Sequence, residues 1–132
     1  MDNKAFVLKF IEALNTFDAA NYEPYLAEEP VYWVGMNRQV GRAAFKANTD
    51  AGRILYPKPE TVSTKIMAVL ADGNWVSVLS IRKAATNRIP DYENIYAVFC
   101  EVIDGKIATH VEVLDTAVAE KAFDLSAIQG VR

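Results

Sequence analysis

The chain has 132 residues, of which 52% are hydrophobic and 23% charged, and its formal net charge is −3. Lys and Arg are scattered along it, which disfavours a nucleic-acid-binding surface because such a surface needs a positive patch to neutralise phosphates. No hydrophobic run approaches the roughly 18 residues that cross a bilayer. Lys9 and Glu12 interrupt the N-terminal segment, so we expect neither a signal peptide nor contact with a membrane.

The first half of the sequence predicts three helices and one strand. Four hydrophobic residues are spaced at i, i+3, i+4 and i+7, as on one face of an amphipathic helix: Val7, Phe10, Ile11 and Leu14. Asp18 is a good N-cap for a second short helix over residues 19–29, which would end before Pro30. Residues 31–36 (VYWVGM) are rich in β-formers and predict a strand, and residues 41–55 predict a third helix.

The second half predicts two long β-hairpins and a short closing helix. Asp-Gly between two β-rich runs is a strong hairpin signal, because both turn residues tolerate a positive φ. The runs are residues 61–71 and 75–84 around Asp72-Gly73, and residues 94–103 and 106–115 around Asp104-Gly105. We therefore expect a single α+β domain, residues 1–132, in which helices pack on one antiparallel sheet. Its core would span about residues 4–125, and residues 126–132 would form a tail.

The register of the second hairpin predicts which side chains share a face. A two-residue turn pairs Ile103 with Lys106, so Ala97 would lie opposite Glu112 and Phe99 opposite His110. Because side chains alternate, these four are expected on one face. The opposite face would carry Tyr96, Val98, Cys100, Val111 and Val113. A carboxylate on a covered apolar face is costly unless it is paired or borders a pocket, so Glu112 is the leading functional candidate.

Three segments resemble the SnoaL-like branch of the nuclear-transport-factor-2-like superfamily: FIEALNTFDAANYEPYLAEEPVYWVGM, VGRAAF and YAVFCEVIDGKIATHVEVLDT. This group includes polyketide cyclases, ketosteroid isomerase, scytalone dehydratase and limonene epoxide hydrolase. The resemblance covers about residues 4–125 and implies a cone-shaped curved antiparallel sheet wrapped around three N-terminal helices, with a deep apolar pocket. It also implies a cofactor-independent isomerase, cyclase or lyase, and the homodimer that is common in the superfamily.

The polar residues of ketosteroid isomerase are not retained. Their places fall on Phe10, Val34 and approximately Phe99, so the resemblance does not imply steroid isomerisation by that constellation. Polyketide cyclases place an acid and a nearby histidine on one late strand. The segment that contains His110 and Glu112 is most similar to that arrangement.

The match to limonene epoxide hydrolase is partial. Its site positions fall on Tyr32 and Val34, on Arg82 and Ala84, and on Glu112. A tyrosine, an arginine and an acid are therefore kept. The asparagine and the second aspartate that would position an attacking water are replaced by apolar residues, so the resemblance does not imply epoxide hydrolysis of that kind.

The candidate site combines four polar residues with an apolar wall. Glu112 would transfer the proton, and His110, Arg82 or Tyr32 would assist it or stabilise an oxyanion. The residues expected to contact substrate are Phe10, Val34, Ala97, Phe99 and Leu114. An alternative for Glu112 is a structural ion pair with Arg82. The alternatives for His110 and Tyr32 are a structural hydrogen bond and core packing, respectively.

These observations predict an acid–base enzyme that acts on a small, apolar, oxygenated molecule by cyclisation, isomerisation or dehydration. The alternative is a non-catalytic binding protein for a small hydrophobic ligand. We expect no cofactor and no metal, since the lone Cys100 and lone His110 supply too few zinc ligands. A single cysteine also suits a reducing cytoplasm. The expected partner is a second copy, bound through the face that carries Tyr96, Val98, Val111 and Val113.

Overall fold

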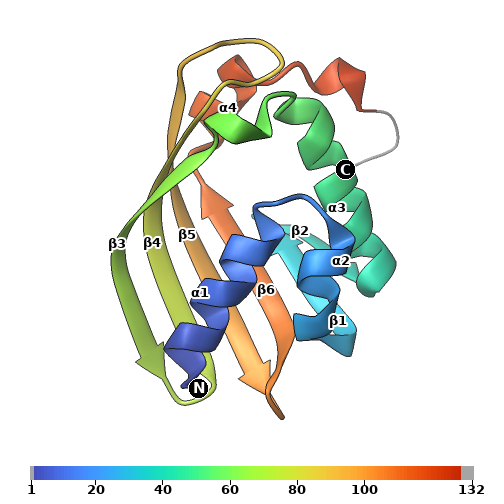
Figure 1. The fold of residues 1–132 in the computed structure, drawn as a ribbon, viewed down its shortest axis with the longest axis vertical. Coiled ribbons are helices and arrows are strands. Elements are labelled where there is room, and N and C mark those ends of the chain that lie inside the picture. The colour runs from blue at the N-terminus through green and yellow to red at the C-terminus, as the bar shows by residue number, and fades with distance from the viewer. Residues whose placement is uncertain (1, 129–132) are drawn as a thin grey trace.

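A curved six-stranded sheet carries helices on one of its faces (Figure 1). The computed structural model describes residues 2–128. Its α-helices are α1 (Asn3–Leu14), α2 (Ala19–Tyr22), α3 (Arg42–Leu55) and α4 (Thr116–Ala122). Its strands are β1 (Leu26–Val34), β2 (Asn37–Val40), β3 (Ser63–Asp72), β4 (Trp75–Ala84), β5 (Tyr92–Ile103) and β6 (Lys106–Leu114). Short 3₁₀ helices cover Glu23–Tyr25, Pro59–Thr61 and Leu125–Ala127. The predicted α+β fold with three N-terminal helices is confirmed.

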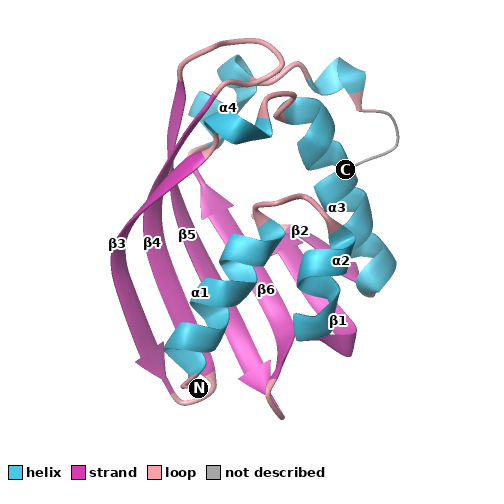
Figure 2. Cartoon of the chain, viewed as in Figure 1, coloured by secondary structure: helices cyan, strands magenta, loops and turns pink. Residues whose placement is uncertain are grey.

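The strands follow the spatial order β2-β1-β6-β5-β4-β3. All neighbours are antiparallel except β1 and β6, which run parallel. Helices α1, α2 and α3 lie over one face, and α4 lies beyond one end of the strands (Figure 2). We call the covered face the inner face and the opposite one the outer face. This arrangement leaves β3 and β2 as the two edges of the sheet.

The expected second helix is much shorter than predicted. Asp18 caps it as expected, by accepting a hydrogen bond from the Ala20 N–H at 3.0 Å. The α-helix ends at Tyr22, and the chain is already extended in β1 from Leu26. Pro24 explains the early end, because it has no N–H to continue an α-helix. Predicting helix over residues 19–29 was therefore wrong after the first turn.

Two further details of the strands differ from the prediction. Asp72 pairs with Trp75, so the first long hairpin turns on Gly73-Asn74 rather than on Asp72-Gly73. The short strand β2 was not predicted. It pairs with β1 after a tight turn in which Gly35 has a φ of +54°, a conformation that glycine adopts without strain.

The second long hairpin contains a β-bulge that changes which residues face inward. Ile103 pairs with Lys106 as predicted, and Val102 pairs with Ile107. Glu101 then pairs with Thr109, so Ala108 is an extra residue in β6. Because a shift of one residue exchanges the two faces of a strand, every predicted pairing beyond this point was wrong.

The bulge places Glu112 opposite Val98 and His110 opposite Cys100. Tyr96, Val98 and Cys100 therefore share the inner face with Glu112 and are buried. Ala97 and Phe99 pair instead with Val113 and Val111 on the outer face, where Phe99 is 41% exposed. Placing Ala97 and Phe99 in the pocket wall was therefore wrong. Placing Tyr96, Val98 and Cys100 on the outer face was wrong for the same reason.

Two hydrophobic clusters fill the space between the inner face and the helices. The larger one contains Phe10 of α1, Phe45 of α3 and Val78, Val98 and Ile107 of the sheet. The smaller one gathers Phe17, Tyr56, Tyr92, Tyr96 and Phe123 near the end of the sheet that α4 covers. The polar side chains described next lie on the inner face, where these clusters pack.

Candidate functional site

Glu112 lies on the inner face between Val98 of β5 and Val34 of β1. Burial raises the pKa of its carboxyl group, and the positive charge of Arg82 offsets only part of that effect. Among residues 2–128 the carboxylate has neither a hydrogen bond nor an ion pair. The alternative of a structural ion pair with Arg82 is therefore wrong. Glu112 is nevertheless not fully buried and keeps some accessible surface.

His110 lies one inner-face position before Glu112 and is enclosed by aromatic rings. Its ring centroid is 4.9 Å from that of Tyr32, 5.8 Å from that of Phe10 and 6.0 Å from that of Phe45. Its Nδ1 is buried and has no hydrogen-bond partner. Burial lowers the pKa of His110 to about 4, so the imidazole is neutral at neutral pH. It is therefore neither the near-neutral acid–base partner nor the structural hydrogen-bonder that the sequence suggested.

Tyr32 pairs with His110 across β1 and β6 and is 6% exposed. Its hydroxyl makes no hydrogen bond within the described part of the chain. Burial and the nearby Glu112 hold the pKa of the phenol well above its usual value, so it stays protonated and able to donate. Tyr32, His110 and Glu112 thus place three polar groups without partners on one covered face. Buried polar groups are normally paired, and such a concentration of exceptions indicates a place for a ligand or water.

Arg82 of β4 reaches into the smaller cluster rather than toward Glu112. Its Nη1 donates to the Tyr56 hydroxyl at 3.1 Å, and its Nη2 donates to Asn15 Oδ1 at 2.9 Å. The guanidinium lies over the Tyr96 ring at 4.5 Å and over the Tyr56 ring at 5.4 Å. These cation–π contacts and hydrogen bonds fix the charge in place while its Nε stays buried without a partner.

A chain of tyrosines beside Arg82 was not found from the sequence. The Tyr56 and Tyr96 hydroxyls are 3.2 Å apart, and those of Tyr92 and Tyr96 are 2.6 Å apart. Asn94 Nδ2 donates to the Tyr92 hydroxyl at 2.8 Å. Tyr92 and Asn94 are both buried. A signal was present, because Glu93 and Glu101 place two charged side chains on the opposite face of β5, which indicates that Tyr92, Asn94 and Tyr96 face the covered side.

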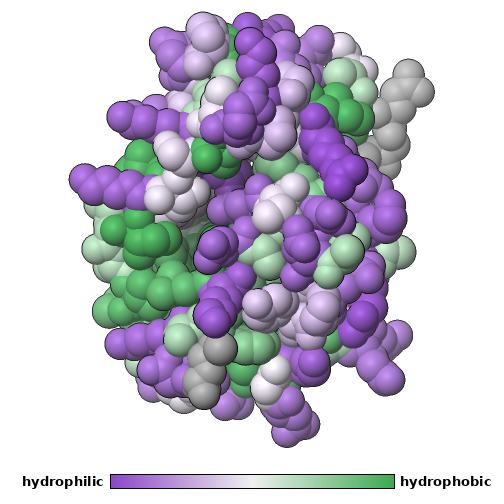
Figure 3. Space-filling model, viewed as in Figure 1, coloured by the Kyte–Doolittle hydropathy of each residue, from purple (hydrophilic) through white to green (hydrophobic). Residues whose placement is uncertain are grey.

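A groove between α1 and β3 leads toward this cluster. It has a volume of about 340 Å³ and is lined by Leu8, Ile11, Glu12, Asn15, Thr64 and Ile66. Figure 3 shows hydrophobic side chains gathered over β3, beside a hollow that α1 borders. Asn15 in the groove accepts the hydrogen bond from Arg82, so the groove reaches the cationic end of the cluster. It is the natural candidate for a ligand entrance.

Of the remaining predicted wall residues, Val34 and Leu114 lie on the inner face and Phe10 of α1 packs against it. Phe10 is fully buried against His110, Val34 pairs with Glu112, and Leu114 pairs with Tyr96. Within residues 2–128, no group of three or more His, Cys, Asp or Glu residues is arranged to hold a metal ion. None of the helices in this range is long and apolar enough to span a membrane.

The fold is that of nuclear-transport-factor-2-like proteins. More narrowly, the chain belongs to the SnoaL-like domain family, whose pattern it matches over residues 7–110. No protein with a curated function matches the chain.

Solved structures share the fold at low sequence identity. A SnoaL-like protein from Shewanella denitrificans, assigned as a polyketide cyclase, is 14% identical with a TM-score of 0.73, over 89% of this chain and 93% of that one. AclR from Streptomyces galilaeus, assigned as a hydroxylase, is 15% identical with a TM-score of 0.71, over 89% and 95%. A protein from Kribbella flavida, assigned as a ketosteroid isomerase, is 23% identical with a TM-score of 0.68, over 85% and 76%. At these identities the similarity establishes the fold.

Proposed function

We propose that this protein is an acid–base enzyme that moves a proton on a small, apolar, oxygenated substrate, with Glu112 as the proton-transfer group. The observation that carries the proposal is the unpaired carboxyl group of Glu112 on a covered face. Burial raises its pKa, and a carboxylate with a raised pKa is a stronger base than it is in water. Structural carboxylates in protein interiors are instead paired, because an isolated buried charge is costly.

The surroundings of Glu112 suit cyclisation, isomerisation or dehydration. Each of these reactions begins with removal of a proton beside a carbonyl or hydroxyl group, and each develops negative charge on oxygen. Tyr32 offers a protonated phenol on the same face, and Arg82 supplies a fixed positive charge that already acts on Glu112. Phe10, Val34 and Leu114 provide the apolar wall that small-molecule sites generally have.

The proposal is tested with 2-tetralone, a small apolar ketone with acidic C–H bonds beside its carbonyl. In D₂O the wild type is expected to accelerate exchange of these hydrogens for deuterium, followed by NMR. Glu112→Gln removes the base at nearly constant volume, so exchange should fall about 10²- to 10⁴-fold, the usual contribution of a general base. Glu101→Gln is the matched control. Glu101 lies on the outer face of β5, so its amide variant should exchange at the wild-type rate.

A binding protein without chemistry is the second candidate, and two observations favour it. Both terminal nitrogens of Arg82 already have protein partners, and His110 does not titrate near neutrality. Fewer groups are therefore left for catalysis than the sequence suggested. The two functions separate in the same experiment. Saturable binding of 2-tetralone with exchange no faster than in buffer would support the binding protein and contradict the role of Glu112 as a base.

A further inference from the structure

The tyrosine chain ends at both sides in groups that can only donate hydrogen bonds. At one end Arg82 Nη1 donates to the Tyr56 hydroxyl, and a guanidinium has no acceptor. At the other end Asn94 Nδ2 donates to the Tyr92 hydroxyl. The amide orientation of Asn94 is fixed, because its Oδ1 accepts from the Ile95 N–H at 2.8 Å and its Nδ2 also donates to the Asp115 carbonyl at 3.0 Å. Neither end can therefore accept a phenol proton.

Counting protons shows that one phenol O–H in this chain has no acceptor. Tyr56, Tyr92 and Tyr96 carry one O–H each. Only two contacts join them, between Tyr56 and Tyr96 and between Tyr92 and Tyr96. Two protons are used in these contacts, and the third has no partner among residues 2–128.

Tyr96 is the phenol with the unused proton. A hydroxyl that accepts a hydrogen bond becomes a stronger donor in turn, because bonded groups polarise one another. Tyr56 accepts from Arg82 and Tyr92 accepts from Asn94, so both are primed to donate to Tyr96, which touches both. Tyr96 then accepts two hydrogen bonds and keeps its own O–H for another oxygen. Burial and the neighbouring phenol Tyr56 hold the pKa of Tyr96 far above its usual value, so this proton stays in place at neutral pH.

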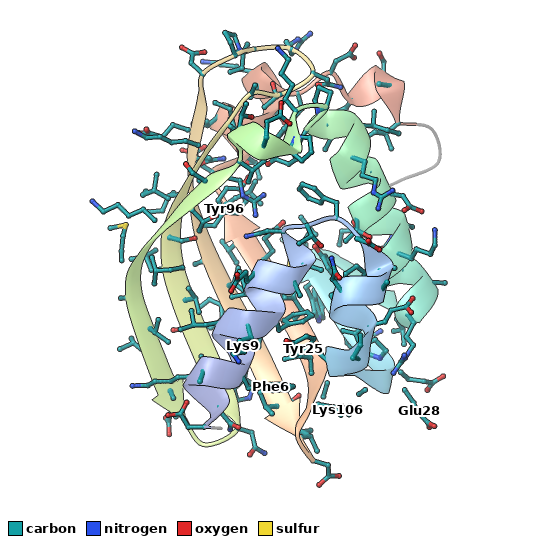
Figure 4. The ribbon with its side chains drawn as sticks, viewed as in Figure 1. Phe6, Lys9, Tyr25, Glu28, Tyr96 and Lys106 are labelled. Atoms are coloured by element: carbon teal, nitrogen blue, oxygen red, sulfur yellow. The ribbon has the colours of Figure 1, made fainter. Side chains whose placement is uncertain are left out.

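The strand register places Tyr96 near Glu112 and near a residue of the groove. Tyr96 pairs with Leu114 and Val98 pairs with Glu112, so Tyr96 and Glu112 are diagonal neighbours on the inner face, about 7–8 Å apart at Cα. In the other direction, Tyr96 pairs with Ser80, and Ser80 pairs with Ile66 of the groove. The Ser80 hydroxyl also lacks a hydrogen bond within the described chain. Figure 4 shows Tyr96 on the sheet, beyond the C-terminal end of α1.

We infer that the Tyr96 hydroxyl binds the carbonyl oxygen of the substrate and that the substrate is a small compound with an enolisable carbonyl group. This inference rests on the proposed acid–base function. The Glu112 carboxylate takes the proton from the carbon beside the carbonyl. The C–H electron pair becomes the C=C bond, and the carbonyl π pair moves to the oxygen, which Tyr96 stabilises by its hydrogen bond. The proton on Glu112 is then returned to the enolate, so no oxidant, reductant or co-reactant is consumed.

The residues that line the groove agree with an uncharged substrate. Leu8, Ile11 and Ile66 offer apolar contacts along the groove, whereas Glu12 in the same groove would repel an anion. An uncharged ketone or ester can pass this carboxylate and place its oxygen at Tyr96. The negative charge then forms only in the transition state, beside Arg82 and the tyrosines, where it lowers the barrier instead of strengthening ground-state binding.

The carbonyl stretching band of bound 2-tetralone measures the Tyr96 hydrogen bond directly. In the wild type the infrared band should lie at lower wavenumber than in an aliphatic solvent. Tyr96→Phe should shift it back toward the solvent value and slow deuterium exchange about 10²- to 10³-fold, as the loss of one oxyanion donor does. Tyr92→Phe keeps Tyr96 but removes one hydrogen bond to it, so a smaller shift in the same direction is expected.

Two controls separate this inference from the role of Glu112. Glu112→Gln should lose exchange but keep the shifted carbonyl band. Tyr25→Phe should change neither, because the Tyr25 hydroxyl has no hydrogen bond in the described chain, and Figure 4 shows Tyr25 well away from Tyr96. An unshifted band in the wild type, or a band and exchange rate unchanged in both Tyr96→Phe and Tyr92→Phe, would overturn the role of Tyr96. The Glu112 result would stand on its own. A wild type that binds no 2-tetralone would overturn the substrate class.

Discussion

Glu112 and His110 lie two residues apart on β6, and burial shifts their pKa values in opposite directions. Both side chains are kept from their charged forms, so the pKa of the acid rises and the pKa of the base falls. The consequence for Glu112 is a more basic carboxylate, and the consequence for His110 is a permanently neutral ring at neutral pH. The strand therefore presents one reactive group and one aromatic wall, although its sequence suggests an acid–base pair.

His110 should make the protein sensitive to mild acid. Its folded pKa of about 4 lies below the ordinary value of 6.5, so its stabilising contribution is complete above pH 6.5 and is lost as the pH falls toward 4. This lowering of the pKa corresponds to about 3 kcal/mol of unfolding free energy. Urea denaturation of the wild type and His110→Phe at pH 7 and pH 4 measures this contribution.

His110→Phe keeps an aromatic ring among Phe10, Tyr32 and Phe45 but cannot take up a proton. Relative to the wild type, it should gain about 3 kcal/mol of unfolding free energy as the pH falls from 7 to 4, because the wild-type unfolded state takes up the His110 proton before the folded state does and the variant takes up none. The remaining acid sensitivity, from carboxylates elsewhere, is common to both proteins and cancels in the difference. A difference that does not change with pH would show that His110 titrates normally.

At the scale of the elements, Gly52 in the last turns of α3 fixes how the helix meets the tyrosine cluster. A Cβ at this position would lie 2.6 Å and 2.7 Å from two ring carbons of Phe17. The Phe17 ring stacks on Tyr56, with 5.5 Å between ring centroids and 14° between planes. Gly52 thus allows the close approach that holds Phe17 against a member of the hydrogen-bonded chain.

Gly52→Ala should destabilise the protein by about 1–3 kcal/mol, because the Phe17 ring must move within a packed cluster. Helix propensity alone predicts the opposite sign, a gain of about 1 kcal/mol. Urea denaturation distinguishes the two. The control is Ala47→Gly at an exposed position of the same helix, where only propensity acts and a loss of about 1 kcal/mol is expected. A Gly52→Ala protein more stable than the wild type would contradict the packing argument.

The elements that sequence reasoning predicted well are those specified by local signals. The stripe of α1, the Asp18 cap and the Asp104-Gly105 turn depend on neighbouring residues, and all are present. The bulge at Ala108 has no such signal, since it involves neither glycine nor proline. Because the extra residue was not predicted, the inner and outer faces of β5 were exchanged in the prediction. Tyr96 was therefore left out of the predicted site. Glu112 and His110 kept their shared face because both lie beyond the bulge.

At the scale of the whole molecule, the outer face of the sheet is apolar and only partly covered. Exposed fractions are 40% for Trp75, 44% for Ile95, 41% for Phe99 and 47% for Val113. These residues lie on β4, β5 and β6, opposite the face that the helices cover. Exposed apolar side chains that gather on one face of a sheet are typical of interaction sites. We expect a second copy of the chain to cover it, as the family resemblance implies.

Phe99→Lys should convert a dimer to a monomer, because it places a charge among the apolar residues that would be buried between the two copies. Light scattering during size-exclusion chromatography measures the mass. Met36→Lys is the matched control, since Met36 is 89% exposed in the turn between β1 and β2. It should leave the mass unchanged. A monomeric wild type would contradict the expected dimer. Because Phe99 points away from Glu112 and Tyr96, the Phe99→Lys monomer should still catalyse exchange of 2-tetralone, which would show that each chain carries a complete site.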